Sequence, residues 1–581
     1  MLSSFITDEQ IVGKLITYRC KYADNMSKNH QLHDFVTLKP HSHETKEQKF
    51  IYSLFPPRSQ WCHIDGDVRN KERKGWARRE LMDSTQRNAF MLRMTYRKAK
   101  KENSQAGWFL KLSGYVNHIQ KMMMQPPDRI DSPKVKMLFK KEDKNKKTIV
   151  CRPVCSFPLD LKLVFSLLNK YLTKLFDPYF LDCSYAFRQN NGNRSQFQHL
   201  DAVNSLVEYR KAHGKTLYVA ECDMQKFYDT IDHNVIKYRL NTLMSKVKSL
   251  GDINSSDSKI VKRWFYCYID SLDFYKDVFK YNDDQKSSVW NIVRSKIPKE
   301  SSQLWRCKVK WVDCLEYHKV CGKGVPQGGA LSGIIANVVM HRVDENLYAA
   351  MNGKDMQYFR FCDDMVLVGT NESEVRNVLD VYNRSIKSSK LFSHENEGLN
   401  ISHMREFWEG KSRGPYKWGR KGQDIFPWIT FVGFDINWNG DLRVRRKSFK
   451  KQLSKQHSVV WDLLAHYKRG EQPRYSKPTI LESLSNRLIG MSVGRVTMYN
   501  YKDYPNFHCW LSAFPILKRN SWVNRQLKQL DKHRWMELCK AKNFLEKIEC
   551  PQRIKNKNRK VNTTHIYGKP FSYYGQAYKD F

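Results

Sequence analysis

The sequence predicts an α+β fold in which short buried strands lie among longer amphipathic helices. Apolar and aromatic runs at residues 217–222 and 358–369 are typical of buried strands. Residues 87–97, 108–124 and 372–389 instead have the spacing of apolar positions expected of helices. The chain has 581 residues, and single hydrophobic cores stop growing at about 250–300 residues. We therefore expect three or more lobes.

The charge balance predicts a polyanionic partner. The chain has 101 Lys and Arg against 59 Asp and Glu, a formal net charge of +42. Each phosphate that such a surface neutralises releases counterions and strengthens binding. A ribosomal-type or membrane-surface protein could share this charge, but 13% aromatic and 41% hydrophobic residues indicate a packed, folded body. The partner is expected to be RNA, DNA or both.

Cysteine usage and hydropathy predict a cytoplasmic protein. The 14 cysteines include no Cys-x-x-Cys pair, and Cys222 and Cys362 lie within expected core strands, so we expect free buried thiols in a reducing compartment. Residues 1–8 lack a signal-peptide pattern, and no run of 18 apolar residues occurs. No membrane partner is expected.

Three stretches combine carboxylates and glycines between strands and helices. Asp363 and Asp364 lie between two apolar arms, where a hairpin turn is expected, and Asp223 follows the strand at 217–222. Residues 324–337 run from a glycine-rich turn into an apolar helix. An isolated Asp-Asp pair is usually an exposed turn. At a buried hairpin, adjacent carboxylates would cost several kcal/mol unless a divalent metal compensated them.

In this order, these three stretches resemble the reverse transcriptases, in particular prokaryotic ones of the group II intron and defence-associated (abortive-infection or unknown-group) kinds. The resemblance covers roughly residues 134–470. It implies a right-hand polymerase with fingers, a palm with an antiparallel sheet, a helical thumb, and helical N- and C-terminal extensions. The expected divisions are a basic N-terminal extension at 1–125, fingers at 126–215, palm at 216–445, thumb and C-terminal helices at 446–550, and a basic, aromatic tail at 551–581. Within the palm, an insertion spans about 245–320, with a loop at 252–258 and a helix at 260–279.

The resemblance implies a catalytic site with two Mg²⁺ ions, for which Mn²⁺ could substitute. Asp223 and Asp363 would bind both ions, because Mg²⁺ prefers carboxylate oxygens and water. Asp364 would support the ions indirectly, by interacting with the groups that bind them. The backbone carbonyl of Met224 would complete the ligands of the second ion.

The incoming deoxynucleotide would lie between the fingers and the palm. A hairpin at 134–155 is expected to bring Arg152 and a lysine to the triphosphate. Lys140 is the candidate carried forward, with Lys146 and Lys147 as alternatives. Tyr228 would be the aromatic gate that excludes a 2′-hydroxyl. Gln327 and Gly328 would let the backbone approach the nucleotide closely.

Two further motifs depend on the resemblance alone. Residues 399–405 are similar to the strand before the family's proton-donating lysine, but Arg405 stands in that position. Arginine is a poor general acid, so His403, a residue outside this register, or water would serve instead. Phe431, Gly433 and Phe434 match the primer-grip hairpin.

The sequence therefore predicts an RNA-directed DNA polymerase with an RNA template, which could be a dedicated non-coding RNA, a DNA product and deoxynucleoside triphosphates as partners. Antiviral (anti-phage) defence is the favoured setting. Rival hypotheses are a template-independent DNA polymerase on the same palm and a group II intron-type maturase or RNA-binding protein. An RNA-directed RNA polymerase is disfavoured by Tyr228.

Overall fold

The chain divides into two compact units. The computed structural model describes residues 2–36, 44–62, 84–143, 148–189, 198–279, 308–310, 319–394, 396–397, 410–420, 422, 424–493, 509–550 and 568–574. The first unit comprises Met1–Ile11, Val116–Val432 and Trp438–Gly440, and the second comprises Val12–Tyr115, Gly433–Asn437 and Asp441–Phe581. The division falls at other places than the predicted lobes, whose boundaries stay predictions.

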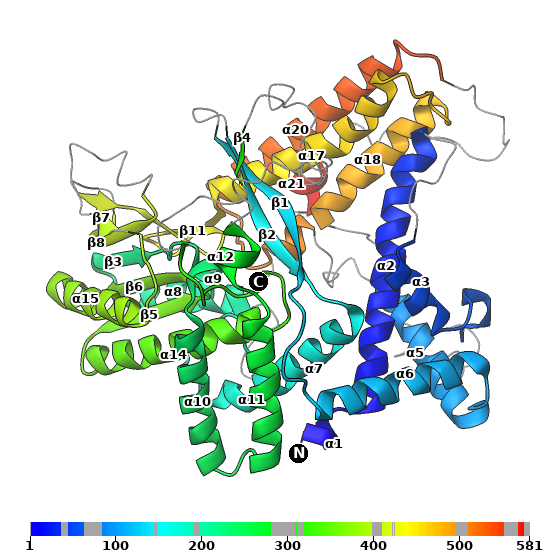
Figure 1. Ribbon diagram of the computed structural model, residues 1–581. Coiled ribbons are helices and arrows are strands. Elements are labelled where there is room, and N and C mark those ends of the chain that lie inside the picture. Colours follow the sequence, from blue (N-terminus) through cyan, green and yellow to red (C-terminus); the bar gives the residue numbers. More distant parts are fainter. Residues whose placement is uncertain are drawn as a thin grey trace, which may run out of the picture. The chain divides into compact units, whose positions relative to one another are not determined.

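A largely antiparallel sheet forms the centre of the first unit (Figure 1). Its strand order is β5-β6-β3-β8-β7, with β9 paired to β8. The strands are β3 (Leu217–Cys222), β5 (Met356–Phe361), β6 (Asp364–Gly369), β7 (Asn396–Glu397), β8 (Ser412–Trp418) and β9 (Ile425–Phe426). The first four in this order pair antiparallel, whereas β7 and β9 pair parallel with β8. The predicted buried strands are confirmed: 217–222 forms β3, and the two arms of 358–369 form β5 and β6.

Helices cover this sheet because its strands are apolar on both faces. Helices α14 (Ser332–Met351) and α15 (Glu372–Ser388) pack against the sheet and against each other. Val366, Leu367 and Val368 of β6 are almost fully buried. Other helices of this unit are α7 (Leu159–Phe176), α8 (Gln198–Ala212), α10 (His233–Ser249) and α11 (Ser255–Asp270).

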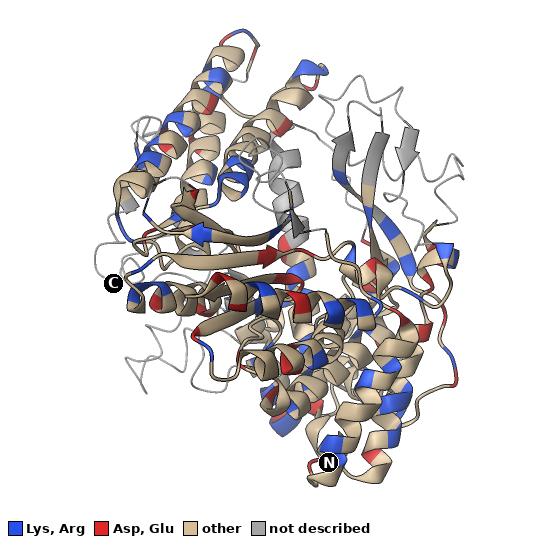
Figure 2. Cartoon of the chain, turned by 90° about the vertical axis from the view of Figure 1, so that its left-hand side faces the viewer, with Lys and Arg blue, Asp and Glu red and all other residues tan. Residues whose placement is uncertain are grey.

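The predicted hairpin at 134–155 is confirmed. Strand β1 (Lys134–Asp143) pairs antiparallel with β2 (Thr148–Ser156), and β2 pairs parallel with β4 (Lys308–Lys310). Lys and Arg residues recur along the described part of this hairpin (Figure 2). The alternatives Lys146 and Lys147 lie outside the described residues.

The predicted element boundaries within the insertion are wrong. The Asn254 side chain accepts a hydrogen bond from Asp257 N, which starts α11 at Ser255 instead of leaving a loop there. This helix ends at Asp270, and a separate turn of helix, α12, spans Phe274–Asp277. The remainder of the insertion to residue 320 is described only at 308–310 and 319–320.

The second unit is mainly helical. Its elements are most of α2 (Asp8–Val36), α3 (Lys46–Ser53), α5 (Ser84–Glu102), the start of α6 (Gly107–Met124), β11 (Phe434–Asn437), β12 (Leu442–Val444), α17 (Arg446–Lys468), α18 (Lys477–Val493), α19 (Trp510–Ala513), α20 (Ser521–Leu545) and α21 (Pro570–Tyr574). Leu463, Leu484 and Leu538 bring α17, α18 and α20 into one apolar core. The helices predicted near 87–97 and 108–124 are confirmed as α5 and α6.

Two expectations, on membrane-spanning helices and on thiols, concern the described residues. No helix among them is long and apolar enough to cross a bilayer. Cys222 and Cys362 are buried thiols that form no disulfide, as predicted.

Candidate active site

Strand register brings Asp223 to the Asp363 hairpin. Cys222 pairs with Met365 across β3 and β6, so the next residue, Asp223, lies opposite Asp364 at the end of both strands. Phe361 pairs with Asp364, which leaves Cys362 and Asp363 as a two-residue turn. Burial raises the pKa of Asp363, and the negative charge of Asp223 raises it further. The two carboxylates are therefore close enough to interact.

Asp364 lies differently from the prediction, which placed both aspartates in the turn. It is the first residue of β6 and is exposed, whereas Asp363 is partly buried. Cys362 takes the left-handed φ of 62° that a tight two-residue hairpin requires. The turn is thus formed one residue earlier, which separates the environments of the two carboxyl groups.

Asp223 is held on its strand end by polar neighbours. Its backbone N–H donates to Ser412 Oγ at 3.0 Å, and its carbonyl accepts from His394 N at 3.0 Å. Its Oδ2 lies 3.2 Å from Lys411 Nζ. Met224 forms an antiparallel bridge with Ser393. The backbone hydrogen bonds of this bridge are donated by Gln225 N and His394 N, so they do not involve the Met224 carbonyl.

The donor set suits a hard divalent cation. Among the described residues, no group of three or more His, Cys, Asp and Glu is arranged as a ligand set. Two carboxylates are nevertheless enough where water and triphosphate oxygens supply the other ligands. Burial is the main cause of the raised pKa of Asp363, and the nearby carboxylate of Asp223 adds to it. The oxygens of Asp223 and Asp363 therefore fit Mg²⁺ or Mn²⁺.

Tyr228 lies beside the Cys362–Asp363 turn, and its role as an aromatic gate stays a prediction. It belongs to α9 (Phe227–Thr230), a helical turn that follows Lys226 with φ 50°. Its hydroxyl lies 3.1 Å from Cys362 Sγ. Burial raises the pKa of Tyr228, with Cys362 adding to the effect. The hydroxyl is therefore neutral and the ring position is fixed relative to Asp363.

The glycine loop is fixed between the Tyr228 segment and the β1–β2 hairpin. Val325 N donates to the carbonyl of Tyr228 at 2.8 Å, and Cys155 N of β2 donates to the carbonyl of Gln327 at 2.8 Å. Gly328 has φ 80°, and a Cβ there would lie 3.0 Å from Val154 Cγ1. Only glycine meets both requirements without strain.

The Gln327 side chain is hydrogen bonded to Asp229, a residue of α9. Its Nε2 donates to Asp229 Oδ1. Burial raises the pKa of Asp229 to about 6, although Lys226, Gln327 and Lys140 lower it. Asp232, by contrast, caps the following helix α10, where its side chain accepts hydrogen bonds from Asn234 N and Val235 N.

Cations gather near this pair. Lys140 lies at an irregularity in β1 between Phe139 and Lys141, and Arg152 of β2 pairs with Leu138 of β1. Burial lowers the pKa of Lys140, and the positive charges of Lys226 and Arg152 lower it further. Lys140, Arg152 and Lys226 therefore interact electrostatically and could bind a polyanionic triphosphate together.

The residues of the predicted primer grip are mostly buried. Phe431 is 3% exposed at the end of β10 (Trp428–Phe431), and Phe434 is fully buried at the start of β11. Val432 and Gly433 have φ of 43° and 90°, as in a two-residue hairpin turn. Any contact by the two phenylalanines would thus be made by backbone, and their grip function stays a prediction.

Lys411 and His394 are candidate residues that sequence reasoning missed. Lys411 Nζ lies 3.1 Å from His394 Nε2 as well as next to Asp223. The predicted donors His403 and Arg405 lie outside the described residues. In the sequence, Lys411 directly precedes the strand at 412–418. Gly414 and Pro415 interrupt the alternation of apolar and polar residues in this strand, which weakens its signal.

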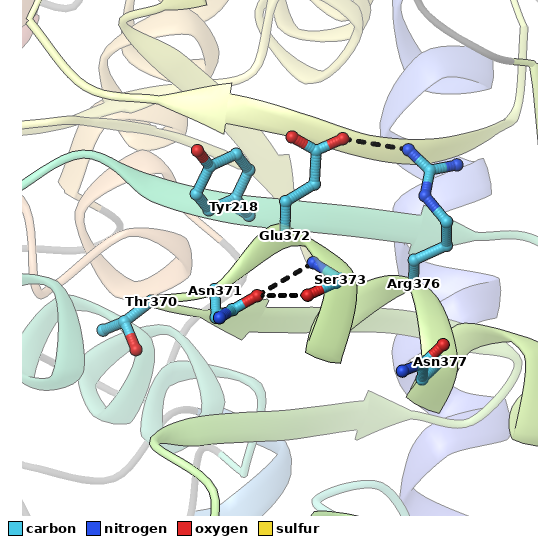
Figure 3. A pocket seen from close by; sticks show the side chains of 7 residues that line it. All are labelled: Tyr218, Thr370, Asn371, Glu372, Ser373, Arg376 and Asn377. Carbon is cyan, nitrogen blue, oxygen red and sulfur yellow. Dashed lines mark hydrogen bonds and ion pairs between the residues drawn. The ribbon is translucent and has the colours of Figure 1, made fainter.

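An open hollow of about 500 Å³ lies elsewhere on the first unit (Figure 3). Tyr218 and Thr370 line it with the start of α15. Tyr218 pairs with Gly369 at one end of the β3–β6 pair, whereas Asp223 and Asp364 lie at the other end. At the usual rise per residue, the two ends are roughly 15 Å apart. Its Asn371 and Arg376 side chains are engaged by Ser373 and Glu372. This hollow is separate from the carboxylate site.

Carboxylates at the end of an antiparallel sheet, beside a glycine loop and a basic hairpin, define a palm-type nucleotidyltransferase. Residues 140–396 match the family model described as "Reverse transcriptase (RNA-dependent DNA polymerase)". The chain thus contains a reverse transcriptase domain and is an enzyme of the RNA-directed DNA polymerase class. The expected right-hand polymerase fold is confirmed. An RNA template and a DNA product are the partners of this activity.

Comparisons with whole proteins add less to the assignment than the domain match does. No curated protein matches the chain. Solved structures that resemble it include an apo telomerase from Candida tropicalis, with 14% identity, 98% of this chain and 82% of that chain covered, and a TM-score of 0.35. A telomerase from Candida albicans in complex with a TWJ fragment of telomeric RNA has 12% identity, coverages of 85% and 76%, and a TM-score of 0.31. These low scores leave the domain match as the basis of the assignment.

Proposed function

We propose that the chain copies RNA into DNA with two divalent ions held by Asp223 and Asp363, and that it acts in the cytoplasm in antiviral defence. The observation that carries the chemistry is the register of β3 with the β5–β6 hairpin, which places these carboxylates together. Asp364 and the Met224 carbonyl would support the same ions. When bound, the ions would activate the primer 3′-hydroxyl and neutralise the triphosphate.

The remaining residues would bind and select the nucleotide. Arg152 and Lys140 would bind the triphosphate, and Lys226 is added to them by its proximity. Tyr228 would exclude a 2′-hydroxyl. The Gly328 backbone would lie against the nucleotide, while Asp229 would fix the Gln327 amide, since the two side chains are hydrogen bonded. Each of these roles is part of the proposal.

The antiviral setting is favoured by the parts of the chain outside the domain. The family match begins at residue 140 and ends at 396, so helices at both ends of the chain lie outside the matched domain. We propose a prokaryotic, defence-associated enzyme whose template could be a dedicated RNA. Template-independent synthesis and a maturase-type RNA-binding role remain the rivals.

Primer extension with a defined RNA, four deoxynucleotides and Mg²⁺ tests the proposed function. Sequencing the product should give the complement of the RNA. Homopolymeric or random product would contradict templated copying and support the template-independent rival. Absence of any product with Mg²⁺ or Mn²⁺ would favour the non-enzymatic RNA-binding rival.

Lys411 is proposed as the proton donor to the leaving pyrophosphate. Burial lowers the pKa of His394, and the positive charge of Lys411 lowers it further, so the imidazole is neutral and its Nε2 can accept from Lys411 Nζ. These contacts position the ammonium next to Asp223. His403 and Arg405, which lie outside the described residues, stay alternative proton donors.

Lys411→Met is expected to lower the rate of single-nucleotide incorporation about 10²-fold or more, because general acids contribute about 10²–10⁴-fold. Rapid-quench measurements across a range of pH would show this. Lys411→Arg keeps the positive charge but is a poor proton donor, so it should be slow as well. A wild-type rate for Lys411→Arg would show that charge alone is needed.

A further inference from the structure

Arg360 of β5 is fully buried two residues before the catalytic turn, and its side chain is completely hydrogen bonded. A guanidinium has five N–H donors. Nε donates to Asp344 Oδ1 at 2.8 Å and Nη2 to Asp344 Oδ2 at 2.6 Å. Nη2 also donates to Ser184 Oγ at 2.8 Å, while Nη1 donates to Asn337 Oδ1 at 3.3 Å and to the Cys362 carbonyl at 3.1 Å. Every donor thus has an acceptor.

Fold stability alone does not account for this arrangement. Burying an ion pair costs desolvation free energy, and apolar residues of similar volume are often as stabilising or more so. Both partners are inaccessible, with Arg360 at 0% and Asp344 at 1% exposure. Buried polar networks that are fully satisfied fix one geometry instead. The guanidinium is therefore expected to fix the geometry of one of its acceptors.

The Cys362 carbonyl is that group. It belongs to the peptide unit that joins Cys362 to Asp363, and Cys362 has a φ of 62°. The left-handed region costs a non-glycine residue roughly 1–2 kcal/mol, so the turn needs a contact that maintains it. The bond from Arg360 Nη1 fixes this peptide plane, and the plane sets the direction of the Asp363 side chain.

The other acceptors belong to different parts of the palm. Asn337 and Asp344 lie on α14, the helix that follows the glycine loop. Ser184 lies in the segment whose backbone flanks Arg360, with Arg360 N donating to the carbonyl of Cys183 at 2.8 Å and Tyr185 N to the carbonyl of Arg360 at 3.0 Å. One side chain thus connects the turn to the helix that carries the nucleotide loop.

We propose that Arg360 is a positioning residue that orients the Asp363 carboxylate for divalent-ion binding by holding the Cys362 carbonyl against α14. This inference rests on the proposed metal-binding role of Asp363. Arg360 itself is buried and takes no direct part in the reaction. Its removal is expected to weaken ion binding before it weakens the fold.

The test is binding of Mn²⁺ to the full chain, followed by electron paramagnetic resonance, with Arg360→Lys as the variant. A lysine can pair with Asp344 but lacks the planar fork, so it cannot also hold the carbonyl. Loss of a group that orients a ligand costs about 10–100-fold in metal affinity. We expect a drop of about tenfold or more in Mn²⁺ affinity and an equal rise in half-saturating Mg²⁺ for DNA synthesis.

Tyr358→Phe is the matched control. The Tyr358 hydroxyl donates to Asp344 Oδ1 at 3.1 Å, and the residue is 2% exposed. Its loss disturbs the same buried network but leaves all five Arg360 bonds. The Tyr358→Phe protein should therefore keep wild-type Mn²⁺ affinity, and thermal melts should show similar Tm for both variants.

A second variant covers the case in which Arg360→Lys does not fold. Arg360→Gln with Asp344→Asn removes both buried charges together and also loses the carbonyl contact. Wild-type Mn²⁺ affinity in a folded variant, or failure of both variants to melt cooperatively, would overturn the proposal. Asp363→Ala gives the background: if wild type binds Mn²⁺ no better than Asp363→Ala, the proposed metal role fails independently of Arg360.

Discussion

Asp363→Asn is expected to abolish DNA synthesis while leaving the protein folded. The asparagine keeps the size of the side chain but removes the charge that would bind both ions, and loss of a catalytic group of this kind costs about 10³-fold or more in rate. Primer extension on an RNA template measures the loss. In cells challenged with phage, the same variant should lose protection if the defence role is correct.

The thermal stability of Asp363→Asn should change in the opposite direction from its activity. Burial and Asp223 raise the folded-state pKa of Asp363. In the absence of metal the folded state therefore binds protons more tightly than the unfolded state, and its stability falls as the pH rises through the raised pKa. Removing this charge should give Asp363→Asn an equal or higher Tm than wild type in EDTA at neutral pH.

Asp364→Asn is the matched control for this pair of results. Asp364 is exposed at the start of β6, and we propose that it only supports the ions. Its substitution is expected to cost about 10-fold in rate. If Asp364→Asn were as inactive as Asp363→Asn, the division of roles between the two carboxylates would be wrong.

Tyr228→Ala is expected to admit ribonucleotides. The ring is held beside the turn by the contact of its hydroxyl with Cys362 Sγ, where it would block a 2′-hydroxyl. Size discrimination by an apolar wall is worth about 10–200-fold, so the preference for deoxynucleotides should fall by that factor. The ratio of kcat/KM for matched ribo- and deoxynucleotides measures it and is insensitive to partial unfolding.

Tyr228→Phe separates the ring from the hydroxyl. It keeps the steric wall but loses the contact with Cys362, so the preference for deoxynucleotides should remain close to wild type. An unchanged preference in Tyr228→Ala would contradict the gate and revive an interpretation of this side chain as simple packing.

Much of the central sheet could be predicted because its signals are local. The apolar runs of β3, β5 and β6 exceed what an exposed strand would tolerate, and the lysine-rich stretch 140–147 between two apolar arms predicts the β1–β2 hairpin. Asp223 and Asp363 could also be proposed, since charged residues at the ends of buried strands require compensation.

The remaining site residues depend on contacts between distant segments. Asp229 is paired with Gln327, 98 residues further along the chain, and Lys411 approaches Asp223 across the β3–β8 pair. Arg360 reads in the sequence as one charge within an apolar strand, and only its five acceptors show why it is tolerated there. The turn was displaced by one residue because the φ of Cys362 has no signature in its side chain.

The most direct test of the central claim is a structure of the full chain with RNA template, DNA primer, a non-hydrolysable deoxynucleotide and Mn²⁺, in which anomalous scattering locates the ions. We expect ions ligated by carboxyl oxygens of both Asp223 and Asp363, with the triphosphate completing their ligands. Ions bound to only one of these side chains, or located away from both, would contradict the account.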